Sequence, residues 1–400
     1  MKRAPLSAAL AAVPFAAQSA VPSIVRPLVL AALLLTSVLL LPGCSALSYY
    51  WQAFNGQMEV GRRARPVEDV LADGAASAEL KRKLAYAQRA REFASRELGL
   101  PDNQSYRRYA DVQRPYVVWN VFSAPALSLR LNTHCFPVAG CVPYRGYFAE
   151  EAAQREAAAL RAAGDDVYVG GVPAYSTLGW FDDPLLNTFI HYPDLEIARL
   201  IFHELAHQVA YVKDDAAFNE SYAVAVEEEG LKRWAAANAD ADANANANAA
   251  EVRRYEAFRA RQRELVNLLM RTRTALTALY ESAADDAARR AGKAGAIGAL
   301  KAEYETLKRG WNLTAEETRR YDDWFYRDLN NARLGSTAIY TGHVAAFARL
   351  LVREGGSMEA FHKTVKALAA LPREERIKQL AAAVEQVPQV PLAQRGGPAP

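Results

Sequence analysis

The chain has 400 residues, enough for one large domain or two modest ones, and 51% of them are hydrophobic and 23% charged, as in an ordinary globular protein. Lys and Arg number 48 against 45 Asp and Glu, and three of the cations, Lys2, Arg3 and Arg26, lie in residues 1–43, which contain no acid. The remainder is therefore neutral, which excludes the basic surface that nucleic-acid binding requires.

Residues 1–43 have the pattern of a signal peptide. A basic, Pro- and Ala-rich stretch ends at Arg26, and the uncharged run from Pro27 to Leu41 is short for a membrane-spanning helix. The run ends in Leu41-Pro42-Gly43-Cys44, which resembles a bacterial lipobox. We expect a bacterial lipoprotein anchored in the membrane through Cys44 and facing the periplasm, at the outer membrane because no Asp follows Cys44. The alternative is a single membrane anchor with an incidental cysteine.

Two further cysteines, Cys135 and Cys141, have five residues between them. In an oxidising periplasm they could close a small loop, and two buried free thiols are the alternative.

The first half of the chain mixes helices and strands. Helical spacing of apolar residues predicts a helical region from Val67 to Leu100, broken near Gly74, and an Ala/Glu-rich helix from Ala149 to Ala163. Clusters of β-forming residues predict four short strands, at residues 117–122, 127–131, 167–169 and 174–180.

The second half reads as helical throughout. Asp194 can cap a helix from Leu195 to about Val212, and a second helix covers Ala216 to Ala236. An alternating Ala/Asn/Asp tract follows, which cannot bury apolar surface. Beyond it, the pattern predicts a helical hairpin interrupted at residues 292–298 and a final helical block at residues 328–353 and 358–384. The fold class is therefore mainly α with one small β-sheet (α+β).

The informative motif is His203-Glu204-Leu205-Ala206-His207. Residues four apart point the same way on a helix, so the two histidines can hold one zinc ion. Glu204 can then act as the general base that takes the proton of the attacking water. The pattern is short, but the helix around it is apolar enough to be buried, as such a site requires.

Two glutamates are candidates for the third zinc ligand. Glu227 lies twenty residues after His207, the spacing of thermolysin-like enzymes, whereas Glu220 lies thirteen after it. Glu227 begins a run of three glutamates that reads as a solvated face, and Glu220 stands between Phe218 and an apolar stretch. A buried carboxylate needs a partner such as zinc, so we expect His203, His207 and Glu220 to bind one Zn²⁺ ion.

A family resemblance joins these motifs. The HELAHQ segment from His203 and the segment Phe218-Asn219-Glu220-Ser221-Tyr222-Ala223 resemble the gluzincin pattern of alanyl aminopeptidases, with a shorter connection. More closely, the chain resembles a family of proteobacterial zinc aminopeptidases that are predicted lipoproteins. Its further matching segments lie at residues 140–148, 174–181 and 330–334. The resemblance implies a zincin-like fold, a peptide substrate and a zinc-bound Glu220.

The expected domain organisation combines these observations. It comprises a signal peptide (1–43), a zincin-like catalytic region (44–236), an Ala/Asn/Asp-rich linker (237–250), a helical C-terminal region (251–385) and a flexible tail (386–400).

Supporting residues are less well defined. An oxyanion donor is expected in such a site, and Tyr340 is our choice, with Tyr222 and His343 as alternatives. Residues 174–181 could be an edge strand that binds extended peptide, or a core strand with Trp180 as filler. No acidic residue lies in that segment to hold a free amine, although Asp182, Asp183 or one of Glu227 to Glu229 could do so.

The sequence therefore predicts a zinc metallopeptidase, with aminopeptidase specificity implied by the resemblance alone. A zinc endopeptidase is one alternative. The other is a non-catalytic, lipid-anchored binding or scaffold protein with a structural zinc. Such a protein would have little reason to keep Glu204 beside the open zinc position. The sequence does not define an oligomeric state.

Overall fold

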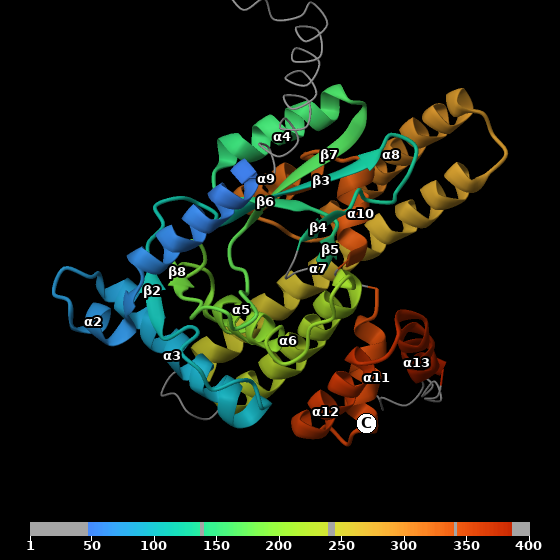
Figure 1. Cartoon of the computed structure of the whole chain (residues 1–400). Coiled ribbons are helices and arrows are strands. Elements are labelled where there is room, and N and C mark those ends of the chain that lie inside the picture. The colour runs from blue at the N-terminus through green and yellow to red at the C-terminus, as the bar shows by residue number, and fades with distance from the viewer. Residues whose placement is uncertain (1–46, 137–139, 239–244, 340–341, 386–400) are drawn as a thin grey trace, which may run out of the picture. The chain divides into compact units, whose positions relative to one another are not determined.

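The computed structural model describes residues 47–136, 140–238, 245–339 and 342–385 (Figure 1). The signal peptide, Cys44 and Tyr340 lie outside these residues. The chain divides into two compact units, residues 1–54 and 55–400, and a helix at residues 47–63 contains the boundary. Within the described part of the chain, no helix combines the length and apolar character needed to cross a membrane.

The second unit is mostly helical with small sheets, so the α+β prediction is confirmed. Its helices, in chain order, are α2 (Val67–Ala72), α3 (Ala78–Leu98), α4 (Glu150–Ala162), α5 (Asp194–Ala206), α6 (Ala216–Asn238), α7 (Ala245–Glu281), α8 (Asp286–Arg309), α9 (Ala315–Tyr326), α10 (Asn331–Ile339), α11 (Val344–Arg353), α12 (Met358–Ala369) and α13 (Arg373–Glu385).

Three small sheets are present among the described residues, rather than the single predicted sheet. They consist of β1 (Arg65–Pro66), β2 (Arg108–Ala110) and β8 (Leu185–Leu186); β6 (Arg145–Tyr147), β3 (Val118–Pro125) and β7 (Asp165–Val172); and β4 (His134–Phe136) with β5 (Gly140–Val142).

Strand β3 is the centre of the largest sheet. It pairs antiparallel with β6 and with β7, from Val118 opposite Val172 to Pro125 opposite Asp165. Seven of its eight residues are buried, so both of its faces are covered. Helices α4 and α10 both pack against β3 and β7 (Figure 1).

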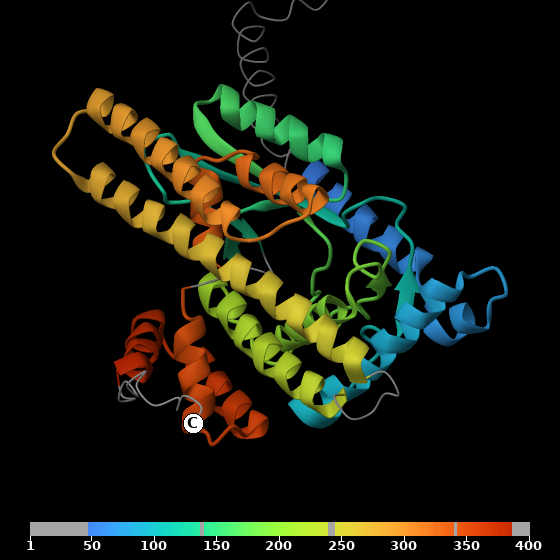
Figure 2. The same ribbon diagram turned by 180° about the vertical axis from the view of Figure 1, so that it is seen from behind.

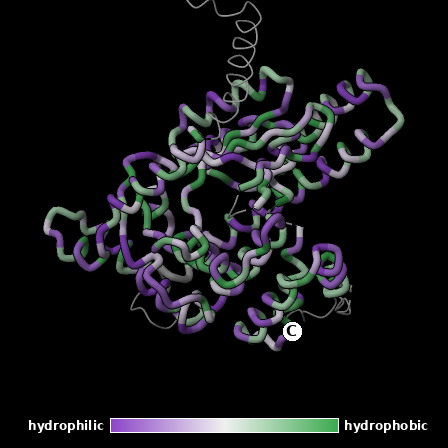
Figure 3. Tube along the Cα trace, in the orientation of Figure 1, coloured by the Kyte–Doolittle hydropathy of each residue, from purple (hydrophilic) through white to green (hydrophobic). Residues whose placement is uncertain are grey.

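The main core surrounds α5. This helix packs against α3 and α6, and α6 packs in turn against α11. Hydrophobic and hydrophilic residues both occur along the helical part of the chain (Figure 3). Ten of the thirteen residues of α5 are buried, so the helix that carries the HExxH motif is a core element.

Several predicted elements differ from the structure. The strand predictions at residues 127–131 and 174–180 are wrong, because both segments are irregular. Helix α5 ends at Ala206 rather than near Val212. Asp194 does not cap it through a side-chain hydrogen bond, because its carboxylate instead binds Arg82 and Lys83 at 2.7 and 2.6 Å.

The helical hairpin turns earlier than predicted. Helices α7 and α8 lie side by side (Figure 2), and the turn between them falls at residues 282–285. The glycines at 292–298 lie inside α8. A Cβ on Gly292 would be 2.7 Å from Leu279 Cδ2, so this glycine allows close helix packing and does not end the helix. At the other end, α6 and α7 both extend into the stretch expected as a linker.

Candidate metal centre

The two histidines of the HExxH motif lie at the carboxyl-terminal end of α5. His203 is in the last turn, and His207 follows the helix as its C-cap residue with helical backbone angles (φ −60°, ψ −22°). Because residues four apart share one face, the ring centroids come within 4.9 Å of each other. Both side chains are buried. The end of α5 thus holds a pair of imidazoles inside the protein.

Asn219 and Asp215 fix the connection from α5 to α6. The Asn219 side-chain oxygen accepts a hydrogen bond from the Val212 N–H at 2.7 Å, and its amide donates to the Val212 carbonyl at 2.8 Å. Asp215 accepts an N–H from the first turn of α6 and forms a buried ion pair with Arg376 at 2.7 Å. These contacts determine where Glu220, the residue after Asn219, extends.

Glu220 completes a three-residue cluster with the histidines. Its Oε2 lies 3.3 Å from His203 Nε2 and 3.9 Å from His207 Nε2, and the three ligand atoms lie within 4.8 Å of one another. Two ligands bonded tetrahedrally to one zinc ion at about 2.0–2.1 Å would be about 3.4 Å apart. The donor types and separations therefore fit zinc with small adjustments, and they leave a fourth position for substrate or water.

The charges of the cluster also fit a cation. Burial alone would lower the pKa of His203, but its hydrogen bonds to Glu220 and Glu227 outweigh burial and raise the pKa to about 10. Burial lowers the pKa of His207 to about 4, and its Nδ1 has no hydrogen-bond partner among the described residues. Two carboxylates thus converge on one imidazole, an arrangement that a proton on His203 or a metal cation would stabilise.

Glu227 lies behind His203, on the side away from Glu220. Its Oε2 is 2.9 Å from His203 Nδ1 and 2.7 Å from a guanidinium nitrogen of Arg199. Burial would raise the pKa of Glu227, but Arg199, His203 and Arg259 together lower it to about 2. Glu227 is 1% exposed, so the interpretation of this residue as part of a solvated face is wrong. The carboxylate sets the orientation of the His203 ring.

Glu204 is 7% exposed and lies next to the cluster. Burial raises the pKa of its carboxyl to about 7, and the carboxylates of Glu220 and Asp183 act in the same direction. A carboxyl with a pKa near neutrality can accept and release a proton at physiological pH. Tyr106 is buried, and its hydroxyl has no hydrogen-bond partner among the described residues. Burial raises the pKa of Tyr106, and the negative charge of Glu204 raises it further. Nothing in the sequence marked Tyr106.

A loop held by internal hydrogen bonds borders this side of α5. Asp183 is buried and accepts the Thr177 N–H at 3.0 Å, while the Thr177 hydroxyl is hydrogen-bonded to the backbone N–H and C=O of Phe181 at 3.1 Å. A Cβ on Gly179 (φ +82°) would be 3.7 Å from Gln208 Oε1, so the loop packs against the residue that follows His207.

The loop exposes two aromatic side chains. Trp180 is 71% exposed and Phe181 48% exposed, although their backbone is held by the contacts around Thr177. Residues 174–181 form neither an edge strand nor a core strand, and Trp180 does not fill the core. The loop instead exposes apolar surface beside Gly179, which packs against Gln208.

Other predicted site residues lie elsewhere. The hydroxyl of Tyr222 is hydrogen-bonded to His362 Nδ1 at 2.8 Å in the core, so Tyr222 does not serve as an oxyanion donor. The His343 N–H donates to Ser221 Oγ, and burial lowers the pKa of the His343 ring. In the segment 330–334, which resembles the family, the Asn331 side chain donates to the backbone carbonyls of Pro125 and Ala126 at the end of β3.

Tyr211 is a residue that sequence reasoning missed. It follows His207 by four positions, and burial together with the Glu220 carboxylate raises the pKa of its hydroxyl. The hydroxyl is therefore near the cluster. Tyr211 lies beyond the end of α5, so helical spacing from His207 could not have indicated it.

The two cysteines that follow Cys44 in the chain form a disulfide. Cys135 and Cys141 close the hairpin of β4 and β5, which decides the alternative that the sequence left open. The hairpin packs on the connection between α5 and α6, where Asp214 accepts the Cys141 N–H. The disulfide thus braces the segment that joins the two helices of the cluster.

One family comparison covers most of the chain. Residues 48–380 match the family described as "Putative aminopeptidase", a range that includes all three residues of the metal cluster and Glu204. No curated protein and no solved structure gives a significant match. The chain therefore belongs to this aminopeptidase family, and the family match supports a peptidase function.

Proposed function

We propose that the protein is a zinc-dependent metallopeptidase with a zincin-like site, in which His203, His207 and Glu220 hold one zinc ion and Glu204 is the general base. The observation that carries the proposal is the convergence of two imidazoles and a carboxylate within 4.8 Å beside a buried glutamate. When bound, zinc supplies Lewis acidity, which polarises a scissile carbonyl and makes a water molecule acidic enough to lose a proton near neutral pH.

The protein residues have distinct roles in this proposal. Glu204 accepts the proton of the attacking water and transfers it to the departing amine, for which a pKa of about 7 is well suited. Glu227 holds the Nδ1 proton of His203, so that Nε2 faces the cluster as a ligand. Tyr211 joins Tyr340 as a candidate donor to the developing oxyanion.

Peptide binding next to this site is assigned to the loop at residues 177–183. Its exposed Trp180 and Phe181 can cover an apolar substrate side chain, and its backbone is already ordered, so little conformational entropy is lost on binding.

Cleavage from the amino terminus is the specificity that the family name favours. Of the carboxylates considered as amine-binding groups, Glu227 and Glu228 pair with arginines and Glu229 pairs with Arg233. Among these candidates, Asp183 is the carboxylate whose charge contributes to the raised pKa of Glu204. An aminopeptidase will cleave free peptides and leave N-acetylated copies intact, whereas an endopeptidase will cleave both.

The decisive experiment measures zinc content and peptide hydrolysis for the wild type, Glu204→Gln and Glu220→Ala. Glu204→Gln should keep zinc and lose hydrolysis by roughly 10²- to 10⁴-fold, as expected for loss of a general base. Glu220→Ala should lose both zinc and activity. A folded wild type that binds no zinc would contradict the proposal, as would a Glu204→Gln variant of unchanged activity.

A further inference from the structure

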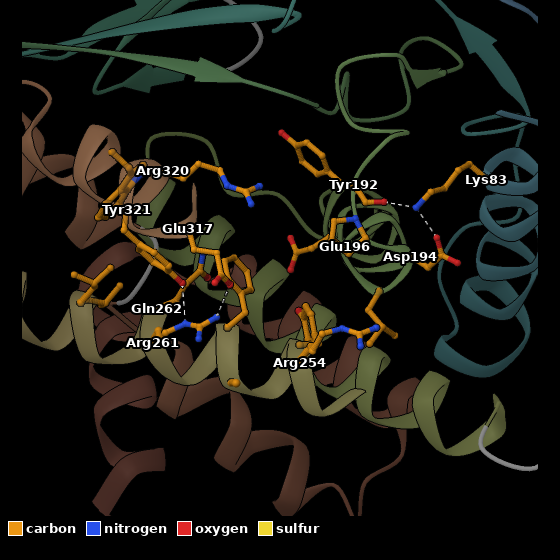
Figure 4. A pocket seen from close by; sticks show the side chains of 18 of the residues that line it. Lys83, Tyr192, Asp194, Glu196, Arg254, Arg261, Gln262, Glu317, Arg320 and Tyr321 are labelled. Carbon is orange, nitrogen blue, oxygen red and sulfur yellow. Dashed lines mark hydrogen bonds and ion pairs between the residues drawn. The ribbon is translucent and has the colours of Figure 1, made fainter. Parts of the chain in front are cut away.

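A cavity lies at the amino-terminal end of α5, at the opposite end of the helix from His207. Its volume is about 1160 Å³, it is open to solvent on one side, and it is lined by α5, α7, α9 and the residues around Lys83 (Figure 4). None of the residues of the metal cluster lines it, and neither does Glu204. Pockets for drug-sized ligands are typically about 300–1,000 Å³, so this cavity can hold several peptide residues.

One wall of the cavity offers an unused acceptor. Glu196 extends into it from α5 and uses Oε2 to bind Arg199 at 2.9 Å, while its buried Oε1 has no partner among the described residues. The buried hydroxyl of Tyr255 is also without a partner among the residues described, and the Glu196 carboxylate contributes after burial to its raised pKa. A buried carboxylate oxygen without a partner is costly unless a donor, such as an ammonium group, binds there.

Two arginines from different helices also line the cavity. Arg320 extends into the cavity from α9 (Figure 4), and its pair with Glu316 joins two side chains that are both 70% exposed, which makes it a weak pair. Arg254 on α7 also lines the cavity. In contrast, Arg261 is held by the Tyr321 hydroxyl at 3.1 Å. Arg320 is therefore the cation best able to bind a carboxylate.

Aromatic residues lie on the same walls as the charges. Phe258 on α7 and Tyr321 and Trp324 on α9 line the cavity, and Trp324 is 43% exposed. The lining thus offers an acid from α5, arginines from α7 and α9, and aromatic surface for an apolar side chain. This combination matches the three parts of a free peptide: ammonium, apolar side chain and carboxylate.

We propose that this cavity binds a short peptide with both ends free, its ammonium group on Glu196 and its carboxylate on Arg320. The site is distinct from the proposed metal centre, and binding there does not require zinc. It is nevertheless linked to that centre, because Arg199 joins Glu196 to Glu227, which contacts His203.

The test is isothermal titration of the full chain with the dipeptide Leu-Phe in excess chelator, so that no metal-dependent hydrolysis occurs. Matched probes are N-acetyl-Leu-Phe and Leu-Phe amide. We expect the wild type to bind Leu-Phe and each blocked peptide to bind at least tenfold more weakly. No binding of Leu-Phe, or equal binding of all three peptides, would overturn the proposal.

Variants separate this cavity from the metal centre. Glu196→Gln and Arg320→Gln should each weaken Leu-Phe binding about tenfold or more, while Arg319→Gln on the same exposed helix and His207→Ala should bind like the wild type. Because Arg320 is 70% exposed, its replacement leaves folding intact even if Glu196→Gln does not. Binding that depends on His207 and not on Arg320 would place the peptide at the metal centre and refute the second site.

Discussion

Glu227 Oε2 lies 2.9 Å from His203 Nδ1, on the side of the imidazole away from Glu220. The two glutamates therefore contact opposite edges of His203, although the sequence offered both as candidates for the third zinc ligand. Glu220 reaches the Nε2 edge where a metal would bind, and Glu227 holds the opposite edge. Such outer carboxylates fix the tautomer and the orientation of a ligating histidine.

Glu227→Gln should weaken zinc binding by about 10- to 100-fold without abolishing it, because the ligands remain and only the support of His203 is lost. Competition with a chromophoric chelator measures this affinity. Glu228→Gln, a neighbouring residue that pairs with Arg259 nearer the surface, is the matched control and should bind zinc like the wild type. A complete loss of zinc in Glu227→Gln, together with retention in Glu220→Ala, would reverse the two assignments.

Asp183→Asn should remove a pH dependence of stability. Burial raises the pKa of Asp183 to about 6 from an ordinary value of 3.8, so the folded protein binds this proton more tightly than the unfolded chain. The contribution of Asp183 to stability is therefore fully present below pH 3.8 and is lost as the pH rises to 6. Between pH 4.5 and 7.5 the wild type should lose about 2 kcal/mol relative to the variant.

Urea unfolding of both proteins at the two pH values measures this difference, and groups common to both proteins cancel in it. A difference in unfolding free energy that does not change with pH would show that Asp183 is ionised throughout. That result would mean that the hydrogen bonds from the loop outweigh burial.

Trp180→Ala should raise KM about tenfold for substrates with a large apolar side chain and leave KM for alanyl substrates nearly unchanged. The physical reason is the loss of apolar surface that the substrate would cover, and tenfold corresponds to about 1.4 kcal/mol. Trp51→Ala, which removes another exposed tryptophan in the first compact unit, is the control. Equal effects of Trp180→Ala on all substrates would argue against a side-chain subsite in the loop.

Metal removal should abolish peptide hydrolysis and leave the fold in place. The core around α5 is built from apolar contacts with α3 and α6, and the connection to α6 is fixed by Asn219 and by the Asp215–Arg376 ion pair. Circular dichroism before and after chelation should therefore be nearly unchanged, and added zinc should restore activity. Unfolding of the chain by a chelator would indicate a structural zinc.

Cys44 lies outside the described residues, so its lipidation is tested chemically. The wild type expressed in a bacterial host should incorporate radiolabelled palmitate, and Cys44→Ala should not. The other cysteines provide a built-in control, because Cys135 and Cys141 are paired with each other. Labelling that persists in Cys44→Ala would refute the lipobox interpretation.

The sequence alone determined the parts of the protein that depend on local patterns. Helical spacing defined α3, α4 and α6 closely, and the HExxH spacing placed His203 and His207 on one face of a buried helix. A period of 3.6 residues in apolar side chains is a local property, which explains why these predictions did not need the fold.

Tertiary structure decided the features that depend on distant partners. The run Glu227 to Glu229 reads as a polar surface, yet Glu227 is buried because Arg199 and His203 approach it from α5. The segment around Trp180 has strand-like composition, but the hydrogen bonds of Thr177 and Asp183 fold it into a loop. The roles of Glu220 and Glu227 were separable only once α5 and α6 were packed, because a carboxylate acquires its function from the charges that the fold brings to it.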